Sequence, residues 1–267
     1  MRQKDGFTLI ELIVVTALTA ILSAVILQFS LSYMRFSSIV QSDSSAFVER
    51  LNASDYLREN LGLSSGLITQ NSINDNNALV TGSDTQHWQM LYPVSNTTYG
   101  TTSSVTPLLY FKKYSKDSSG TLISSGTSYY EDEYVLYHDG SSQQLRVRTL
   151  ANPDAAGNVR LTTCPVANAS ATCPADLVLM DNITSVKLRY FSRAGIELSV
   201  TSSGVDALGN TVTPCTNTVY PYTGCIGANF NIVEVVEITL NLQTQPLGTH
   251  SVTTKSATVI RIALRNT

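Results

Sequence analysis

The 267-residue chain has few histidines and lacks the sequence motifs that commonly mark an active site. Its three histidines, His87, His138 and His250, are scattered and have no neighbouring nucleophile motif. The G-x-S-x-G motif, the H-E-x-x-H motif of zinc peptidases and the nucleotide-binding P-loop are all missing. We therefore predict that the protein is not an enzyme and needs no cofactor.

Charge is also scarce. Only 14% of the residues are charged, the formal net charge is −3, and no basic run occurs. Binding to nucleic acid through its phosphates depends on Lys and Arg, so we expect no strong nucleic-acid binding. The acids Glu131-Asp132-Glu133 and Asp181 could ligate calcium, but they lie in no EF-hand-like loop. We interpret them as surface acids.

Glycine and proline are missing from residue 7 to residue 61, and Gly62 and Gly66 follow at once. Because these two residue types usually end helices, this stretch predicts a single helix of about 55 residues, roughly 80 Å long. The alternative is a membrane helix followed by a separate short helix, with a break at the serine-rich patch 42–45.

The first half of this predicted helix is an apolar run to about Leu31 with one charged residue, Glu11. Residues 7–27 would span about 31 Å as a helix, enough to cross a bilayer. Arg2 and Lys4 precede the run, so the positive-inside rule places them in the cytoplasm and the rest of the chain outside. A carboxylate at the bilayer centre costs about 2.5 kcal/mol or more. A plain membrane anchor therefore explains the span but not Glu11.

The second half of the predicted helix is amphipathic. Its apolar stripe comprises Phe36, Val40, Phe47, Leu51, Leu57 and Leu61. Such a stripe needs a globular domain to cover it. We therefore divide the helix into a membrane or filament-core half, residues 7–35, and an outer half, residues 36–62.

The sequence Gly6-Phe7-Thr8-Leu9-Ile10-Glu11 resembles the class III signal of prepilins, the precursors of type IV pilins and type II secretion pseudopilins. The resemblance implies that residues 1–6 are a leader, which prepilin peptidase removes between Gly6 and Phe7, and that the new amine is methylated. It also implies that Glu11 neutralises the Phe7 amine of a neighbouring subunit and so sets the stagger between subunits. The implied partners are other pilin or pseudopilin subunits, an inner-membrane assembly platform and membrane lipid.

Residues 63–267 are predicted to form a β-rich extracytoplasmic domain, because Ser, Thr, Asn and Gly dominate there and helical periodicity ends. The candidate strands are residues 108–114, 130–138, 144–150, 159–163, 177–180, 185–191, 196–200, 232–242 and 257–265. The last two alternate apolar and polar residues, which predicts an antiparallel pair with one buried face. Segments 97–104 and 115–128 are expected to be loops or hairpin tips. The fold class is therefore α+β, with a long helical spine packed on an antiparallel sheet.

The size of this domain indicates which members of the family the chain resembles. Segments 186–190 and 259–266 look like the C-terminal portions of larger minor members, the J-type pseudopilins and W-type pilins. The implied function is a structural subunit that initiates or caps a filament. A tip adhesin or DNA-uptake binding module on the same scaffold is the alternative, and an enzyme anchored by this signal is a third reading.

Four cysteines, Cys164, Cys173, Cys215 and Cys225, all fall in the outer domain. An even number outside the cytoplasm predicts two disulfides. Three pairings are possible, and the simplest joins Cys164 to Cys173 and Cys215 to Cys225. The spacings do not match those of close-set zinc ligands, so no metal site is expected.

Overall fold

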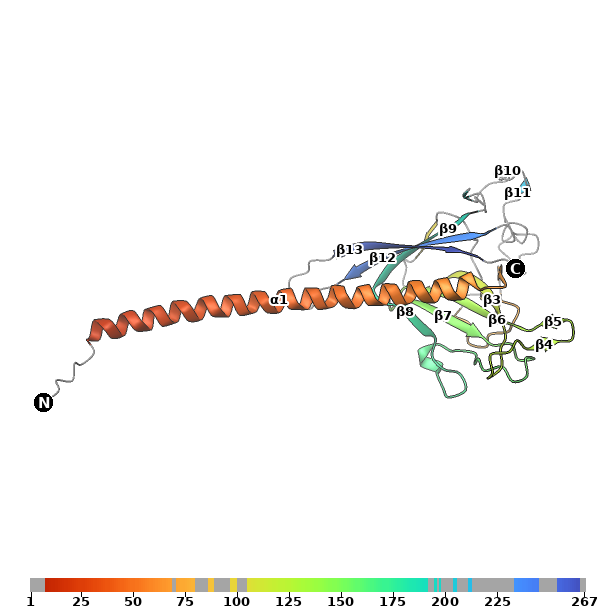
Figure 1. Ribbon diagram of the computed structural model, residues 1–267, viewed down its shortest axis with the longest axis horizontal. Coiled ribbons are helices and arrows are strands. Elements are labelled where there is room, and N and C mark those ends of the chain that lie inside the picture. The colour runs from red at the N-terminus through yellow and green to blue at the C-terminus, as the bar shows by residue number, and fades with distance from the viewer. Residues whose placement is uncertain are drawn as a thin grey trace. The chain divides into compact units, whose positions relative to one another are not determined.

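A computed structural model shows one long helix, α1, and two main antiparallel sheets (Figure 1). The residues that it describes are 8–68, 71–79, 86–88, 97–99, 105–191, 195, 197, 204, 205, 211, 212, 233–244 and 254–264. The chain divides into two compact units. One contains α1 as far as Phe47, and the other, which begins at Val48, holds the end of α1 and both main sheets.

Helix α1 spans Leu9–Gly62, 54 residues without a break at the serine-rich patch. The prediction of a single helix is therefore confirmed. Its part Leu9–Ser38 is long and apolar enough to cross a membrane, and none of its most apolar window is buried.

The first main sheet has five strands in the order β1-β3-β6-β7-β8, and each neighbouring pair is antiparallel. Its strands are β1 (Gly66–Ile68), β3 (Val105–Tyr114), β6 (Glu131–Asp139), β7 (Gln144–Leu150) and β8 (Leu177–Met180). A small hairpin of β4 (Ser124–Ser125) and β5 (Ser128–Tyr129) lies between β3 and β6 in the chain. It is the hairpin tip expected within residues 115–128.

The second main sheet has four strands in the order β13-β12-β9-β2. Its strands are β2 (Thr97–Tyr99), β9 (Ile183–Phe191), β12 (Val235–Thr244) and β13 (Thr254–Ala263). As expected, β12 and β13 are neighbours, and their apolar residues Ile238 and Ile260 point to one buried face. The remaining short elements are η1 (Val166–Asn168), β10 (Gly204–Val205) and β11 (Thr211–Val212).

The core lies where the end of α1 meets the two sheets, and Leu57 and Leu61 are completely buried there. Strand β6 is buried on both faces along most of its length. On the face that carries Tyr134, Lys113 of β3 donates a hydrogen bond from Nζ to Oδ1 of Asn60 in α1, 2.7 Å away. On the opposite face, Glu133 holds the segment 71–79 by accepting hydrogen bonds from its backbone and from a serine hydroxyl. The expected α+β architecture, a helix packed on an antiparallel sheet, is thus confirmed.

Two strand predictions differ from the structure. Residues 159–163 are irregular, because only Val159 and Thr163 donate backbone hydrogen bonds to neighbouring segments and no ladder forms. Thr97–Tyr99, expected in a loop, is strand β2, whose main chain pairs with β9 although its three polar residues give no apolar alternation. Of the expected strand 196–200, only residue 197 is described, in an isolated bridge with Phe191.

The stripe of the outer half of α1 is only partly covered. In the unit that begins at Val48, one face of α1 is buried from Ala53 onward, whereas Leu51 is 48% exposed. In the other unit, Phe36 is 65% and Phe47 58% exposed. Packing of α1 into the core therefore begins about one turn before Leu57, well after residue 36.

Candidate functional site

Helix α1 begins with a closed set of hydrogen bonds between Thr8 and Glu11. The backbone N–H and the hydroxyl of Thr8 both donate to Oε2 of Glu11, each at 2.9 Å. In return, the backbone N–H of Glu11 donates to Oγ1 of Thr8 at 3.3 Å. This reciprocal arrangement is a capping box, with Thr8 as the N-cap and Glu11 at the third helical position.

The capping box explains how a carboxylate can be accommodated at the start of an apolar helix. The first backbone N–H groups of a helix have no partner within the helix, and leaving them unpaired in hydrocarbon is costly. Glu11 satisfies one of them, and its negative charge lies at the positive end of the helix dipole. Among the residues that the structure describes, Thr8 donates only to Oε2, and none donates to Oε1.

Thr8 was missed as a site residue in the sequence reasoning, although its signal is readable. A Thr three residues before a Glu, directly ahead of an apolar run, is the sequence signature of a capping box. The other two predicted residues at this end, Gly6 and Phe7, lie outside the described residues. Of the residues predicted at this site, the structure therefore places Glu11 alone and adds Thr8.

The helix around this site exposes apolar side chains on every side. From Leu9 to Val40, the large apolar side chains of α1 are about half exposed or more, and Leu9 reaches 77%. Soluble monomers rarely leave so large a continuous apolar surface in water. This part of the chain therefore needs lipid or other apolar helices around it.

Comparison with known proteins identifies the type of signal at this N-terminus. Residues 1–27 match a protein family described as the prokaryotic N-terminal methylation motif. The N-terminus is a type IV prepilin signal. The prepilin signal implies processing by prepilin peptidase, assembly with other pilins and a membrane-anchored precursor. No curated protein and no solved structure matches the chain.

Pilin-like proteins with this signal are structural subunits. The match covers the signal and most of the predicted membrane span, and it ends at residue 27. It therefore gives no information about the outer domain.

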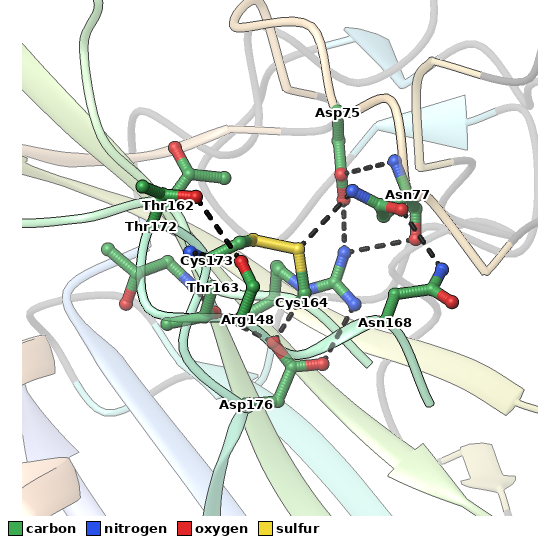
Figure 2. The surroundings of a disulfide bond; sticks show 12 residues. Asp75, Asn77, Arg148, Thr162, Thr163, Cys164, Asn168, Thr172, Cys173 and Asp176 are labelled. Carbon is green, nitrogen blue, oxygen red and sulfur yellow. Dashed lines mark hydrogen bonds and ion pairs between the residues drawn. A yellow bond between two sulfur atoms is a disulfide. The ribbon is translucent and has the colours of Figure 1, made fainter. Parts of the chain in front are cut away.

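One of the two predicted disulfides of the outer domain is present. Cys164 and Cys173 are joined, and their Cα atoms are 5.5 Å apart (Figure 2). Asn77 donates a hydrogen bond to Sγ of Cys164 at 3.3 Å, and Asn168, inside the loop, donates to the side chain of Asn77 at 3.0 Å. These two hydrogen bonds hold the disulfide loop against the segment 71–79. Cys215 and Cys225 lie outside the described residues.

Beside the disulfide, Arg148 is completely buried between two carboxylates (Figure 2). Its Nη1 lies 2.6 Å from Oδ2 of Asp75, and its Nε lies 2.6 Å from Oδ1 of Asp176. The guanidinium carbon also lies 5.2 Å from the ring centroid of Trp88. Tyr137 donates from its hydroxyl to Oδ2 of Asp176 at 2.6 Å.

The environment shifts the pKa of two groups in this cluster. Burial is the largest effect on Tyr137, and together with the hydrogen bond to Asp176 it raises the pKa of the phenol. Burial alone would lower the pKa of Arg148, but the hydrogen bonds and charge of Asp176, with the charge of Asp75, outweigh it and raise the pKa. Arg148 therefore stays charged. Hydrogen bonds from Arg148 hold both carboxylates, and Tyr137 holds Asp176 as well.

Two of the acids interpreted as surface residues are in fact buried, which corrects that prediction. Asp132 accepts hydrogen bonds from Ser115 and Arg160, among others, and Glu133 accepts three from Ser72 and Ile73. Their oxygens are occupied by protein donors. Among the described residues, no cluster of three or more His, Cys, Asp or Glu side chains is arranged to hold a metal ion.

Proposed function

We propose that this chain is a minor pilin or pseudopilin, a structural subunit of a type IV pilus or a type II secretion-like filament. In this proposal, prepilin peptidase cleaves it between Gly6 and Phe7, and it assembles through α1 to initiate or cap the filament. The observation that carries the proposal is the start of α1, where a prepilin signal coincides with a capped carboxylate on a helix with exposed apolar side chains.

The exposed apolar surface of α1 supports a subunit that moves from lipid into a bundle of helices. Lipid and the inside of a helix bundle are both dry and apolar, so the same apolar surface of α1 suits both environments. The disulfide and the buried Arg148 cluster, by contrast, belong to a separately packed outer domain. A stable disulfide fits a domain outside the cytoplasm, which agrees with the orientation that Arg2 and Lys4 predict.

Glu11 would act in assembly by pairing with the Phe7 amine that cleavage creates on a neighbouring subunit. Each charge alone is expensive to hold in a low-dielectric bundle, whereas a hydrogen-bonded pair offsets much of the desolvation. A single allowed pairing also fixes the stagger between two otherwise featureless apolar helices. This is a role in registry, and no chemical reaction is involved.

The capping box gives a substitution that separates this role from helix capping. Gln can replace Glu in a capping box because its amide oxygen accepts the same hydrogen bond, but it carries no negative charge. Glu11→Gln should therefore keep the helix start and lose the charge pair, whereas Glu11→Ala loses both.

The test is co-purification of the full chain with the other prepilin-signal-bearing subunits of its own organism. We expect wild type to be incorporated and both Glu11 variants to be depleted, with leader removal confirmed by intact mass. Equal incorporation of wild type and Glu11→Gln would contradict the charge-pairing role. If deletion of the gene left the filament intact and the outer domain bound a ligand directly, the alternative of an adhesin or DNA-uptake module would replace the structural role.

A further inference from the structure

A groove of about 700 Å³ lies between the end of α1 and strand β13, within the unit that begins at Val48. We call it the edge groove. It is lined by Asp55, Arg58, Glu59 and Gly62 of α1 and by Arg261 and Ala263 of β13. Both walls are exposed to solvent at most of these residues.

Strand β13 turns its unoccupied edge toward this groove. It lies at the end of the order β13-β12-β9-β2, so no described strand pairs with its outer side. On its inner side, the backbone N–H of Leu264 donates to the carbonyl oxygen of Glu234, just before β12, at 2.7 Å. Backbone groups of alternate residues point to opposite sides of a strand, so those of Arg261 and Ala263 point away from β12. In agreement, the carbonyl oxygen of Ala263 lies 3.6 Å from where a Cβ on Gly62 would be.

The wall formed by α1 continues an exposed apolar face of the helix. Val48, Leu51, Asp55 and Glu59 follow one another at spacings of three or four residues, which places them on one helical face. Val48 is 51% and Leu51 48% exposed. The prepilin signal implies assembly with other pilins. A pilin that covers Val48 and Leu51 therefore meets the edge groove next along the same face.

We propose that the edge groove receives an extended segment of a neighbouring, different pilin-like subunit, which adds to β13 as a further strand. Main-chain hydrogen bonds at Arg261 supply the attachment, and charges of both signs, at Asp55 and Glu59 and at Arg58 and Arg261, select the sequence of the segment. The occupant is a different subunit because the proposed function places this chain at a filament end. The inference rests on that function and adds the part of the outer domain that meets the next subunit.

A strand fits this edge better than a helix does. Unpaired edge strands are templates for pairing, and proteins usually protect them with proline or with charged side chains. Residues 257–263 contain no proline and one charged residue, Arg261. Its guanidinium carbon lies 4.7 Å from the ring centroid of Phe191, so its charge is held over the face of the sheet. A helix uses its own N–H and C=O groups internally and has none to offer this edge.

Arg261→Pro and Arg261→Ala form a matched pair for testing the main-chain contact. Proline removes the N–H that faces the groove, and it is tolerated where the N–H of an edge strand points away from its neighbour. Alanine removes the same side chain but keeps the N–H. We expect Arg261→Pro to lower co-purification of the full chain with its partner subunits about tenfold. Arg261→Ala should stay within about threefold of wild type, because the side chain is exposed.

Near-ultraviolet circular dichroism checks that both variants are folded. Equal losses for the two variants would show that the main chain at residue 261 is not used, and would overturn the inference. Normal co-purification of Arg261→Pro would overturn it as well.

Cross-linking tests the occupant without any change to β13. A photoreactive amino acid replaces Glu59 in the groove or, as a control, Val159, which is 54% exposed and does not line the groove. The full chain is produced together with its partner subunits. We expect position 59 to be joined to an outer-domain peptide of a different prepilin-signal-bearing subunit, and position 159 not to be. Cross-links from position 59 only to a partner's long helix, to a second copy of this chain or to lipid would overturn the inference, as would the absence of any cross-link.

Failure of this inference is distinct from failure of the proposed function. If wild type co-purifies with no prepilin-signal-bearing subunit, the proposed function is wrong, and the edge groove is wrong with it. If wild type co-purifies and Glu11→Gln is depleted, but position 59 gives no such cross-link, assembly through α1 stands and only the edge groove is wrong.

Discussion

Arg148 links parts of the chain that are far apart in the sequence. Its two carboxylate partners lie 73 and 28 residues away, and the three side chains are almost fully buried. A buried ion pair adds little stability compared with apolar residues of the same shape, but removing one partner leaves uncompensated charge. Arg148 therefore makes the outer domain sensitive to single substitutions at this point.

Arg148→Ala should lower the free energy of unfolding of the outer domain by about 3–5 kcal/mol, because two buried carboxylates lose their cation. The matched control is Arg189→Ala, since Arg189 also pairs with two acids but its side chain is 35% exposed. The control should cost much less, because solvent screens an exposed ion pair. Urea unfolding of the detergent-solubilised chain measures both, and Trp88, the only tryptophan, reports from the site by fluorescence. Equal losses for the two variants would contradict this reading.

Tyr137 should make the outer domain lose stability in alkali. Its pKa is raised in the folded protein, chiefly by burial. A group with a raised pKa contributes stability that is present below the unfolded-state pKa, near 10 for tyrosine, and that is lost as the pH rises above it. Unfolding free energies measured between pH 8 and about pH 11 should fall, and less steeply in Tyr137→Phe. The exposed Tyr129 provides the control, because Tyr129→Phe should leave the slope unchanged.

For single residues, contacts between neighbours in the sequence could be predicted, whereas contacts between residues far apart in the sequence could not. Thr8 and Glu11 are three residues apart, so their capping box can be read from the sequence alone. The partners of Arg148 come together through the packing of the segment 71–79 and the disulfide loop on the sheet. No spacing in the sequence indicates that contact, and for the same reason Asp132 and Glu133 were mistaken for surface acids.

Among the elements, α1 changes its surroundings along its length. Leu57 is fully buried by the sheets, whereas Leu51, less than two turns earlier, is 48% exposed. Both residues belong to the same apolar stripe, so periodicity alone could not separate them.

This contrast gives a prediction for α1. Leu57→Ala should lower the unfolding free energy of the outer domain by about 2–5 kcal/mol, the usual cost of deleting a buried leucine side chain. Leu51→Ala should change it by about 0.5 kcal/mol or less, as expected for an exposed position. Thermal unfolding followed by near-ultraviolet circular dichroism measures both. A large loss for Leu51→Ala would mean that the covered part of α1 begins earlier.

The disulfide loop should contribute modestly to stability. Cys164 and Cys173 are nine residues apart, and closing so short a loop gains about 2–3 kcal/mol from chain entropy. Replacing both by serine should lower the unfolding free energy by that amount without unfolding the chain. Non-reducing peptide mapping of wild type should recover the Cys164–Cys173 link. An unchanged stability in the double variant would show that the loop is held by Asn77 and Asn168 alone.

Strands with long apolar runs were predicted well, and short or polar strands were not. Strands β7 and β8 match their predicted ranges, 144–150 and 177–180, because turn residues bound their apolar runs. Strand β2 has the sequence Thr-Thr-Tyr and pairs through its main chain at the edge of a sheet, so its side chains give little signal. The irregular segment 159–163 carries an apolar pattern, but only Val159 and Thr163 donate backbone hydrogen bonds to neighbouring segments, so no ladder forms.

For the whole molecule, the prepilin signal determines which part of the N-terminus is expected to be removed. The signal keeps its apolar segment, whereas an ordinary secretory signal is cleaved after it. Gly6→Leu should therefore block removal of the leader, and intact-mass measurement of the membrane-extracted chain should show residues 1–6 still attached. Replacing Asp5 by Asn is the control, because it changes the neighbouring residue and leaves the glycine in place. A wild-type N-terminus beyond residue 20 would instead indicate an ordinary signal peptide.

The capping box at Thr8 and Glu11 has a consequence for the timing of maturation. Every hydrogen bond of that cap comes from residues that follow the proposed cleavage site. Removing the leader therefore takes nothing from the start of α1, and the helix can be the same before and after the peptidase acts. Cleavage removes the leader, with Arg2, Lys4 and Asp5, and creates the new amine of Phe7. A precursor and a mature subunit would then share the same start of α1 and differ in the leader and in the amine that a neighbour recognises. Subunits could accumulate in the membrane fully folded, with a single proteolytic event separating a stored subunit from one that can be added to the filament.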